Sequence, residues 1–252
     1  MIQTVKQILD KEFITAFEKD GYVVLRNFLS ENGLETMRQS LRDIFGAYAL
    51  PGEDVFATVQ RLATTEKELF YRIYKFIAQS FVSLYPVRLE CLPVAQRLLG
   101  GKLHIDIGSA VIFALPSDER LTWDWHQESP YDPDLSETIH FSFPLFEPAT
   151  EDNGTMSVLL GSHKLGMLPH DKVQKSSDSA TSLVPCGIET ISKDYDALPF
   201  VANVGDLAVF HNDIIHRSNN NISGKPRITG LVRIARIEKL PKAASWIDGR
   251  VY

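Results

Sequence analysis

The amino-acid sequence predicts one domain, residues 1–252, that is mainly β: a sandwich or barrel of short strands with helices packed on one face. Apolar residues keep helical spacing up to about residue 100, and after Gly101 the pattern changes to short β-prone runs separated by turn residues. With 44% hydrophobic and 23% charged residues, a chain of 252 residues is long enough for one sizeable core. Helices that precede such strands are available to cover one sheet.

The first predicted helix carries Phe13 and Phe17, four residues apart. It ends at Gly21, because glycine readily adopts the left-handed conformation that stops a helix. Residues 22–25, with the sequence Tyr-Val-Val-Leu, read as a short strand, and Ser30 has a side chain that caps a helix N-terminus. The apolar positions of this second helix are expected to face the core, and they are Leu34, Met37, Leu41, Ile44 and Phe45.

Residues 51–62 show no clear pattern. After them, Thr65 and Glu68 have the spacing of a capping box, which predicts a long helix that ends before Pro86, since the residue before a proline disfavours the helical conformation. A short helix from about Pro93 to Leu99 follows. The apolar stripe of the long helix is predicted to pack in the core rather than to bind a cofactor, and it consists of Leu69, Ile73, Phe76, Ile77 and Leu84.

The second part of the chain, about residues 101–240, is predicted to form the β core. Short runs rich in β-branched and aromatic residues alternate there with turn-rich segments. The predicted strands cover residues 105–115, 139–146, 157–160, 200–203, 207–210 and 228–236. No internal repeat or low-complexity tract stands out.

Composition excludes several classes of protein. The formal net charge is −6 and the pI is near 5.7, so the chain lacks the basic excess typical of a nucleic-acid binder. Cys91 and Cys186 are too few for a disulfide framework, which fits a reducing compartment. The first residues have no signal-peptide pattern, and no stretch approaches about 18 consecutive apolar residues. We therefore expect a cytoplasmic protein with no membrane or nucleic-acid partner, whose oligomeric state the composition does not indicate.

One kind of tripeptide is a candidate metal site: a histidine followed two residues later by an acidic residue. On an extended strand both side chains point to the same face, and a distant histidine can complete a facial set of ligands that suits a non-heme Fe(II) centre. Seven histidines and 32 acidic residues among 252 give about one such tripeptide by chance. The chain has three, so context must select among His104-Ile105-Asp106, His126-Gln127-Glu128 and His211-Asn212-Asp213.

Four separated stretches form a pattern that spans most of the chain. They are residues 17–25 (Phe-Glu-Lys-Asp-Gly-Tyr-Val-Val-Leu) with Phe28-Leu29-Ser30, Trp125-His126-Gln127-Glu128 with Tyr131, Asn153-Gly154-Thr155-Met156 with Gly161-Ser162-His163, and Gly205-Asp206 with His216, Ser218 and Arg227. In order and spacing they resemble the phytanoyl-CoA dioxygenase family of Fe(II)- and 2-oxoglutarate-dependent oxygenases. The resemblance favours His126-Gln127-Glu128 among the three tripeptides.

The resemblance implies a double-stranded β-helix, the cupin-like jelly roll, with the N-terminal helices packed on one sheet. It also implies that His126, Glu128 and His216 hold Fe(II), and that Arg227 and Ser218 bind the far carboxylate of 2-oxoglutarate. The residue types agree with these roles, because positions 216 and 218 share one face of a strand and the fork of an arginine matches a carboxylate.

The activity that the resemblance implies is hydroxylation of an unactivated C–H bond in a small molecule. O2 and 2-oxoglutarate are then co-substrates, and succinate and CO2 are released. Desaturation, epimerisation and ring chemistry begin with the same hydrogen abstraction and stay open. An alternative on the same fold is a cupin-like metal-dependent isomerase or epimerase, or a non-catalytic small-molecule binder; Ser218 and Arg227 argue against both, because neither needs a clamp for 2-oxoglutarate. The acidic net charge disfavours a CoA ester as substrate.

Two residues depart from the family's pattern. Glu128 stands where the family usually has aspartate, and this carboxylate argues against halogenation, for which a small residue is expected. Leu160 replaces the usual proline before Gly161-Ser162-His163, a segment that we expect to form a turn or cap rather than to take part in catalysis.

Other residues have two interpretations. His211 is the alternative ligand to His216, but five positions apart on a strand the two face opposite sides. Phe143 is a candidate to line the pocket beside 2-oxoglutarate, with packing in the β core as the alternative. Arg233 and Arg236 read as strand-edge charges or as contacts for acidic substrate groups. The candidates for shaping the substrate cavity are Trp123, Trp125, Tyr131 and Trp246.

Overall fold

The computed structural model describes residues 9–79, 81–105, 110–131, 137–174 and 181–236. Its first part is largely helical, with one strand, β1 (Tyr22–Leu25), between the first two helices. The longer helices are α2 (Lys11–Asp20), α3 (Glu31–Gly46), α4 (Val55–Thr65), α5 (Lys67–Gln79) and α6 (Phe81–Leu99). A short helix α7 (Ile188–Ile191) and a 3-10 turn η2 (Ser162–Leu165) follow later in the chain. Within the described ranges, no helix combines the length and the apolar character needed to cross a membrane.

The local signals around α2 and α3 act as predicted. Gly21 ends α2 with φ at +68°, and its N–H donates to the carbonyl of Phe17. Ser30 caps α3, because its hydroxyl accepts a hydrogen bond from the N–H of Gly33 at 3.1 Å. The buried apolar faces of the two helices agree with the predicted spacing, and include Phe13, Phe17, Leu34, Met37, Leu41 and Phe45.

The capping box predicted at Thr65 is wrong. The region without a clear pattern forms α4, and Thr65 is its last residue, with its hydroxyl donating to the carbonyl of Arg61 at 2.8 Å. The stripe predicted for α5 is partly right: Ile73 is buried, whereas Phe76 is 60% exposed. The aromatic side chain that enters the core is instead Phe70, which packs edge-to-face on a ring of the large sheet.

The helix boundary predicted before Pro86 is also wrong. Helix α6 begins at Phe81 and runs through Pro86 and Pro93 to Leu99. Proline removes one backbone donor from a helix, but Pro93 lies on the exposed side of α6, where its ring does not disturb the core. The opposite side of α6 is fully buried and stabilises the helix through Val87, Cys91, Val94 and Ala95.

The described strands form one large sheet and two small ones. The large sheet has the order β1-β9-β4-β11-β2, with β3 paired to the first half of β11, and all of its pairs are antiparallel. The small sheets are β10-β5-β8 and the pair β6-β7. The bounds are β2 (Leu103–Ile105), β3 (Ala110–Ala114), β4 (Thr138–Pro144), β5 (Met156–Leu159), β6 (His170–Gln174), β7 (Thr181–Pro185), β8 (Ala197–Pro199), β9 (Leu207–His211), β10 (His216–Ser218) and β11 (Arg227–Arg236).

The strand predictions are right except around the small sheets. The stretch 105–115 is represented by β2 and β3, and β4, β5, β9 and β11 lie within a few residues of their predicted ranges. Strand β8 precedes the predicted range 200–203, and β6 and β7 were not predicted. Most side chains of β6 are exposed, so it lacks the apolar alternation by which a strand is recognised.

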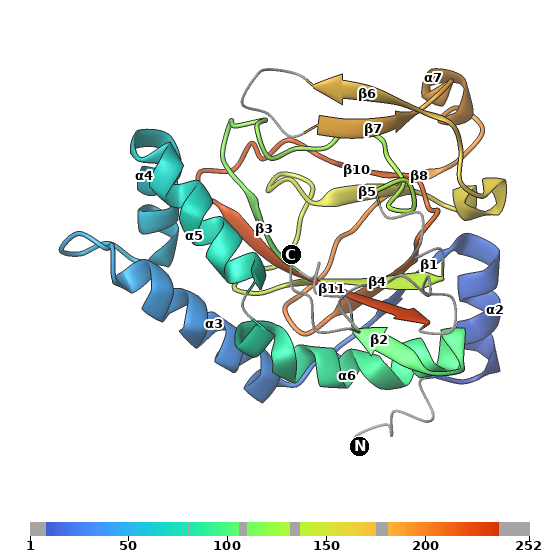
Figure 1. Ribbon diagram of the computed structural model, residues 1–252, viewed down its shortest axis with the longest axis horizontal. Coiled ribbons are helices and arrows are strands. Elements are labelled where there is room, and N and C mark those ends of the chain that lie inside the picture. The colour runs from blue at the N-terminus through green and yellow to red at the C-terminus, as the bar shows by residue number, and fades with distance from the viewer. Residues whose placement is uncertain (1–8, 80, 106–109, 132–136, 175–180, 237–252) are drawn as a thin grey trace, which may run out of the picture.

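The large sheet separates two apolar cores. Side chains alternate between the faces of a strand, so Phe141 and Phe143 of β4 face the helices while Ser142 faces the other way. The helix-side core joins the large sheet to α3, α5 and α6. A smaller core, which includes Val158, lies between the large sheet and the sheet β10-β5-β8. Figure 1 shows this arrangement, with α3, α5 and α6 on one side of the large sheet and the small sheets on the other, which confirms the predicted helical cover of one sheet.

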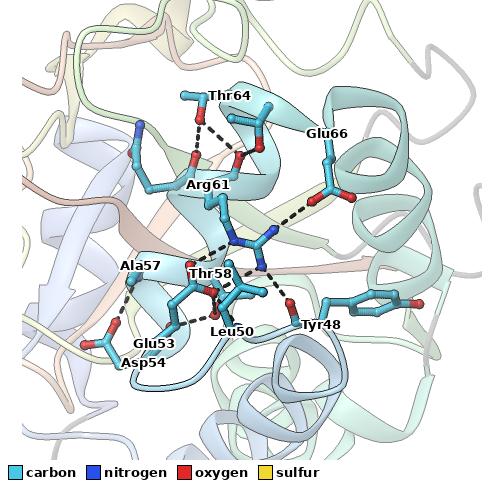
Figure 2. A network of polar contacts seen from close by, with 11 residues as sticks. Tyr48, Leu50, Glu53, Asp54, Ala57, Thr58, Arg61, Thr64 and Glu66 are labelled. Carbon is cyan, nitrogen blue, oxygen red and sulfur yellow. Dashed lines mark hydrogen bonds and ion pairs between the residues drawn. The ribbon is translucent and has the colours of Figure 1, made fainter.

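An ion-pair network fixes the turn between α3 and α4 (Figure 2). The guanidinium of Arg61 binds both carboxylate oxygens of Glu53, at 2.8 and 3.1 Å, and also the carbonyl of Tyr48 and the carboxylate of Glu66. The same carboxylate of Glu53 accepts a hydrogen bond from the N–H of Leu50. These contacts, led by the hydrogen bonds from Arg61, lower the pKa of Glu53 from 4.5 to about 2.

The Arg61→Gln variant should lose stability in a pH-dependent way. A carboxyl with a lowered folded pKa stabilises the fold fully above its unfolded pKa of 4.5, and this contribution is lost as pH falls toward 2. We expect Arg61→Gln to lower the melting temperature at pH 7, and its difference from the wild type to shrink between pH 4.5 and pH 2. Calorimetry at a series of pH values measures this. The exposed-helix variant Arg72→Gln is the control, and a difference that does not depend on pH would contradict the assignment.

Candidate active site

His126 and His216 meet at an isolated antiparallel bridge. The N–H of His126 donates to the carbonyl of His216 at 2.9 Å, and the reverse bond is 3.0 Å. The centroids of the two rings are 4.1 Å apart. The tripeptide geometry assumed an extended strand around His126, although no strand was predicted there. The structure has only this single bridge, but the bridge still brings two histidines ninety residues apart to one point.

The backbone determines which nitrogen of each ring is available. The Nδ1 of His126 lies 2.7 Å from the carbonyl of Asp124, and the Nδ1 of His216 lies 3.1 Å from the carbonyl of Ile214. Because a carbonyl only accepts, each Nδ1 carries a proton, and the Nε2 of each ring is the nitrogen left for a metal ion. Burial and the neighbouring His216 lower the pKa of His126, which favours the neutral imidazole that a metal ion requires.

Glu128 completes the group. Its Oε1 lies 3.6 Å from the Nε2 of His126 and 3.4 Å from the Nε2 of His216. Burial alone would raise the pKa of Glu128, but the guanidinium of Arg233 and the two imidazoles hold it well below its usual range, so the carboxylate is anionic. Within the part of the chain that the structure describes, these three residues form the one group of histidine, cysteine or acidic side chains with ligand atoms all within 4.8 Å of one another.

This donor set fits a divalent non-heme iron. Two imidazoles and one carboxylate form the facial arrangement that such sites use, and ligands about 2.1 Å from an ion lie about 3 Å apart when adjacent, close to the observed separations. The carboxylate of Glu128 therefore lies within reach of the same candidate metal position as the two histidines.

Gln127, the middle residue of the tripeptide, was not predicted to have a role. Its side chain is fully buried and points away from the cavity, where its amide donates to the carbonyls of Gly166 and Asp213 at 2.8 and 2.6 Å. Its Oε1 accepts the N–H of Leu168 at 2.9 Å. Gln127 thus connects the segment of the candidate metal ligands to two other loops, a role that only the tertiary structure reveals.

The segment Gly161-Ser162-His163 has the structural role predicted for it. The hydroxyl of Ser162 accepts the N–H of Ile215 at 2.9 Å, immediately before His216. The N–H of Gly161 donates to the carbonyl of Asp20 at 2.7 Å, and the ring of His163 bonds to the carbonyl of Glu18. Residues 17–25 and the segment Gly161-Ser162-His163, two stretches of the family-like pattern, therefore contact each other and support β10.

Arg227 is buried without an acidic partner. Its Nε donates to the carbonyl of Asn153 at 3.1 Å, one Nη to the carbonyl of Gly154 at 2.6 Å, and the other Nη to the hydroxyl of Thr229. No carboxylate in the described part of the chain pairs with it, and burial lowers its pKa to about 10. A guanidinium has five N–H donors, so two remain for a ligand.

A cavity of about 330 Å³ joins these groups. It lies between the large sheet and the sheet β10-β5-β8. The predicted site residues His126, Glu128, His216, Ser218 and Arg227 all line it.

Phe143 does not line the cavity, so its predicted position beside the co-substrate is wrong. It is fully buried in the helix-side core, where its ring packs against Gly230 of β11. The residue of β4 that lines the cavity is its neighbour Ser142, because adjacent side chains of a strand face opposite sides.

The structure also separates the competing histidines. His211 lies beside His163, with ring centroids 5.2 Å apart, and its Nδ1 accepts the N–H of Asp213 rather than facing the cavity. His104 is in β2 at the far edge of the large sheet, and its tripeptide partner Asp106 lies outside the described residues.

Two of the aromatic candidates for the substrate cavity line it, Trp123 and Tyr131. Trp125 instead makes a cation–π contact with Arg217, whose guanidinium lies 4.5 Å from the centroid of the ring, and Trp246 lies outside the described residues. Arg236 pairs with Glu137 at 2.9 Å, as expected of a strand-edge charge. Arg233 does not match either expectation, because it binds the candidate metal ligand Glu128.

Asn212 contacts the segment that carries Glu128, His140 contacts Asn212, and neither residue was predicted to have a role. The carbonyl of Asn212 accepts the N–H groups of Glu128 and Ser129, and its amide oxygen lies 2.8 Å from the Nε2 of His140. The ring of His140 stacks on Phe210, and burial lowers its pKa to about 3, so it is neutral. Asn212 is the middle residue of His211-Asn212-Asp213, one of the three candidate tripeptides. Its place there was the one sequence feature that could have indicated a role near the site.

The chain is similar to known proteins over most of its length. The family model described as Phytanoyl-CoA dioxygenase (PhyH) matches residues 17–229. The peroxisomal phytanoyl-CoA dioxygenase of Bos taurus is 24% identical over 224 residues, which cover 86% of this chain and 65% of the bovine protein. The ectoine dioxygenase of Nocardia farcinica (strain IFM 10152) is 20% identical over 234 residues, which cover 86% of this chain and 74% of that protein. This chain thus spans less than two thirds of the length of the bovine relative.

A solved structure shows the same fold. The crystal structure of EctD from S. alaskensis with bound Fe matches with a TM-score of 0.60 at 18% identity, and the match covers 92% of this chain and 79% of that chain. The predicted double-stranded β-helix with a helical buttress is thereby confirmed.

Gly154 should be harder to replace than Gly187, another glycine with a left-handed backbone. The φ of Gly154 is +77°, and an added Cβ would lie 2.9 Å from the carbonyl oxygen of Asn219 and 2.9 Å from the backbone N of Asn221. Gly187, with φ at +76°, has open space around the same position and serves as the matched control. Both alanine variants lose about 1 kcal/mol to the left-handed backbone. Crowding should cost Gly154→Ala at least about 1 kcal/mol more. Urea unfolding measures both, and equal losses would refute the crowding argument.

Proposed function

The chain belongs to the phytanoyl-CoA dioxygenase family, and we propose that it is an Fe(II)- and 2-oxoglutarate-dependent dioxygenase. In this proposal it hydroxylates an unactivated C–H bond of a small molecule and releases succinate and CO2. The observation that carries the proposal is a buried guanidinium, that of Arg227, in the same cavity as a His-Glu-His group.

His126, Glu128 and His216 are the residues that would hold the iron. Their two Nε2 atoms and one Oε1 converge on the cavity, and each imidazole is oriented by a backbone carbonyl on its other nitrogen. When bound there, Fe(II) supplies the redox chemistry that a reaction with O2 needs.

Arg227 is suited to hold the far carboxylate of 2-oxoglutarate. A buried cation without an anionic partner is costly, and a carboxylate ligand offsets this cost while accepting the two N–H groups that remain. Ser218 lines the same cavity and has a hydroxyl to offer to that carboxylate. The carbonyls of Asn153 and Gly154 fix the guanidinium, so the co-substrate would be oriented by a rigid group.

The rest of the cavity is available to an organic substrate. Trp123, Tyr131 and Leu231 give it an apolar wall against which an organic substrate can pack. The hydroxyl of Tyr131 accepts the N–H of Leu183 at 2.8 Å, so β7 holds this ring in place. At about 330 Å³ the cavity is compatible with 2-oxoglutarate and a small molecule.

Arg227 also argues against the alternatives on the same fold. A cupin-like isomerase or epimerase without 2-oxoglutarate, or a non-catalytic binder, would not need a buried cation at the far end of a metal cavity. An epimerase or desaturase that uses 2-oxoglutarate would differ from a hydroxylase in its organic product and not in this clamp.

Consumption of 2-oxoglutarate tests the proposed function. The purified chain with Fe(II), 2-oxoglutarate and O2 should form succinate, slowly alone and faster with a suitable small molecule from a broad panel. Mass spectrometry should detect a product that is heavier by one oxygen atom. Absence of both 2-oxoglutarate binding and succinate would overturn the proposal, and Glu128→Ala should abolish succinate formation because it removes one of three metal ligands.

Replacement of Arg227 should separate co-substrate binding from metal binding. Removing one partner of a buried charge pair costs about 2 kcal/mol or more, so Arg227→Gln should raise the KM for 2-oxoglutarate at least about 30-fold. Arg227→Lys should recover only part of this loss, because an ammonium lacks the planar fork. Fe(II) affinity, measured by calorimetry, should stay unchanged, since Arg227 contacts none of the three candidate ligands. An unchanged KM would remove Arg227 from the proposed site.

A further inference from the structure

Arg233 lies on the cavity face of β11. Side chains at alternate positions of this strand, Arg227, Thr229, Leu231 and Arg233, all line the cavity. Six residues of extended strand span about 20 Å, so the two arginines mark opposite ends of the cavity wall. The backbone of Arg233 is opposite His140 of β4, directly behind the candidate metal ligands.

Arg233 binds one carboxylate oxygen of Glu128 and leaves the other facing the two histidines. One Nη of Arg233 lies 2.8 Å from the Oε2 of Glu128, while the Oε1 faces the histidine nitrogens at 3.4 and 3.6 Å. The glutamate side chain is only 12% exposed and that of the arginine 26% exposed, so water screens the pair weakly. One oxygen is therefore directed at the metal position and the other is held away from it.

This division matters because of the number of open coordination positions. An octahedral ion with three protein ligand atoms keeps three positions, and 2-oxoglutarate, as a chelate, needs two of them. A glutamate that binds through both oxygens would occupy a fourth position and leave none after the co-substrate has bound. Glutamate has one more rotatable bond than aspartate, so it has more freedom to turn both oxygens toward the ion.

We propose that Arg233 is a positioning residue, which keeps Glu128 bound to the metal through a single oxygen and so preserves the last open coordination position. This inference rests on the proposed function, because it assumes that the three residues bind a divalent ion. Arg233 acts only through Glu128 and is not itself a ligand. The contact between Arg233 and Glu128 also explains how a chain with glutamate at this position can bind the metal through one oxygen, where the family usually has the shorter aspartate.

The first test counts the water molecules on a bound metal ion. Mn(II) replaces Fe(II), since both accept this mixed nitrogen and oxygen set, and its paramagnetism speeds the relaxation of protons in coordinated water. With 2-oxoglutarate bound, the wild type should keep an exchangeable water and Arg233→Gln should lose it. Metal affinity of the variant should fall at least about 10-fold, as is typical when a partner of a metal ligand is removed.

Two further variants control this measurement. Arg236→Gln removes an ion pair from the same strand, that with Glu137 outside the cavity, and should change neither the coordinated water nor the affinity. Arg233→Lys keeps the charge and should recover the water signal in part, which also covers the case in which Arg233→Gln fails to fold. A water signal in either Arg233 variant equal to that of the wild type, with unchanged affinity, would overturn the inference.

The second test is a double-mutant cycle that combines Arg233→Gln with Glu128→Asp. An aspartate is shorter by one bond, about 1.5 Å, so it cannot reach the metal and Arg233 together. Arg233→Gln should therefore weaken Mn(II) binding at least about 10-fold in the wild type but less than about twofold in Glu128→Asp. Equal losses in the two backgrounds would show that Arg233 acts through the general fold and would refute the proposed role.

The outcomes separate the two proposals. If the wild type binds neither Mn(II) nor 2-oxoglutarate, both the function and the role of Arg233 are wrong. If it binds both and the Arg233 variants behave like the wild type, only the role of Arg233 is wrong.

Discussion

The pair of backbone hydrogen bonds between His126 and His216 is the contact on which the site depends. It joins a segment with little regular structure to the short edge strand β10 and brings two imidazoles together. Carbonyl groups of the same two segments then bind each Nδ1 and leave each Nε2 directed at the cavity. Because the backbone performs this orientation, the rings need no further polar side chains around them.

Much of the recognisable pattern in the sequence serves this contact and not the chemistry itself. Ser162 holds the chain just before His216, and Gly161 is bonded to the end of α2. Asn153 and Gly154 present the carbonyls that fix Arg227, and Gly154 must be glycine because neighbouring backbone leaves no room for a side chain. A resemblance built on such residues identifies the scaffold of a site more directly than its substrate.

The sequence was sufficient to find the candidate metal ligands and the buried arginine of the cavity, but not the residues around them. Spacing and alternation placed His216 and Ser218 on one face, and the structure agrees. The same reasoning failed for Phe143, because every residue of β4 is buried on one side or the other and no polar alternation reveals which face is the cavity. The partners of Gln127 and Arg233 were also hidden, because Arg233 meets Glu128 across 105 positions of sequence, a contact that no local pattern encodes.

The strict alternation along β11 has a consequence for how this chain can diverge. Its odd-numbered positions Arg227 to Arg233 serve the cavity, while Ile228, Val232 and Ile234 fill the core under the helices. Insertion or deletion of a single residue would exchange the two sets, so that guanidinium groups would enter the apolar core and aliphatic side chains the cavity. Homologous chains can therefore differ freely in the length of their loops, but the register of this strand has to be inherited unchanged.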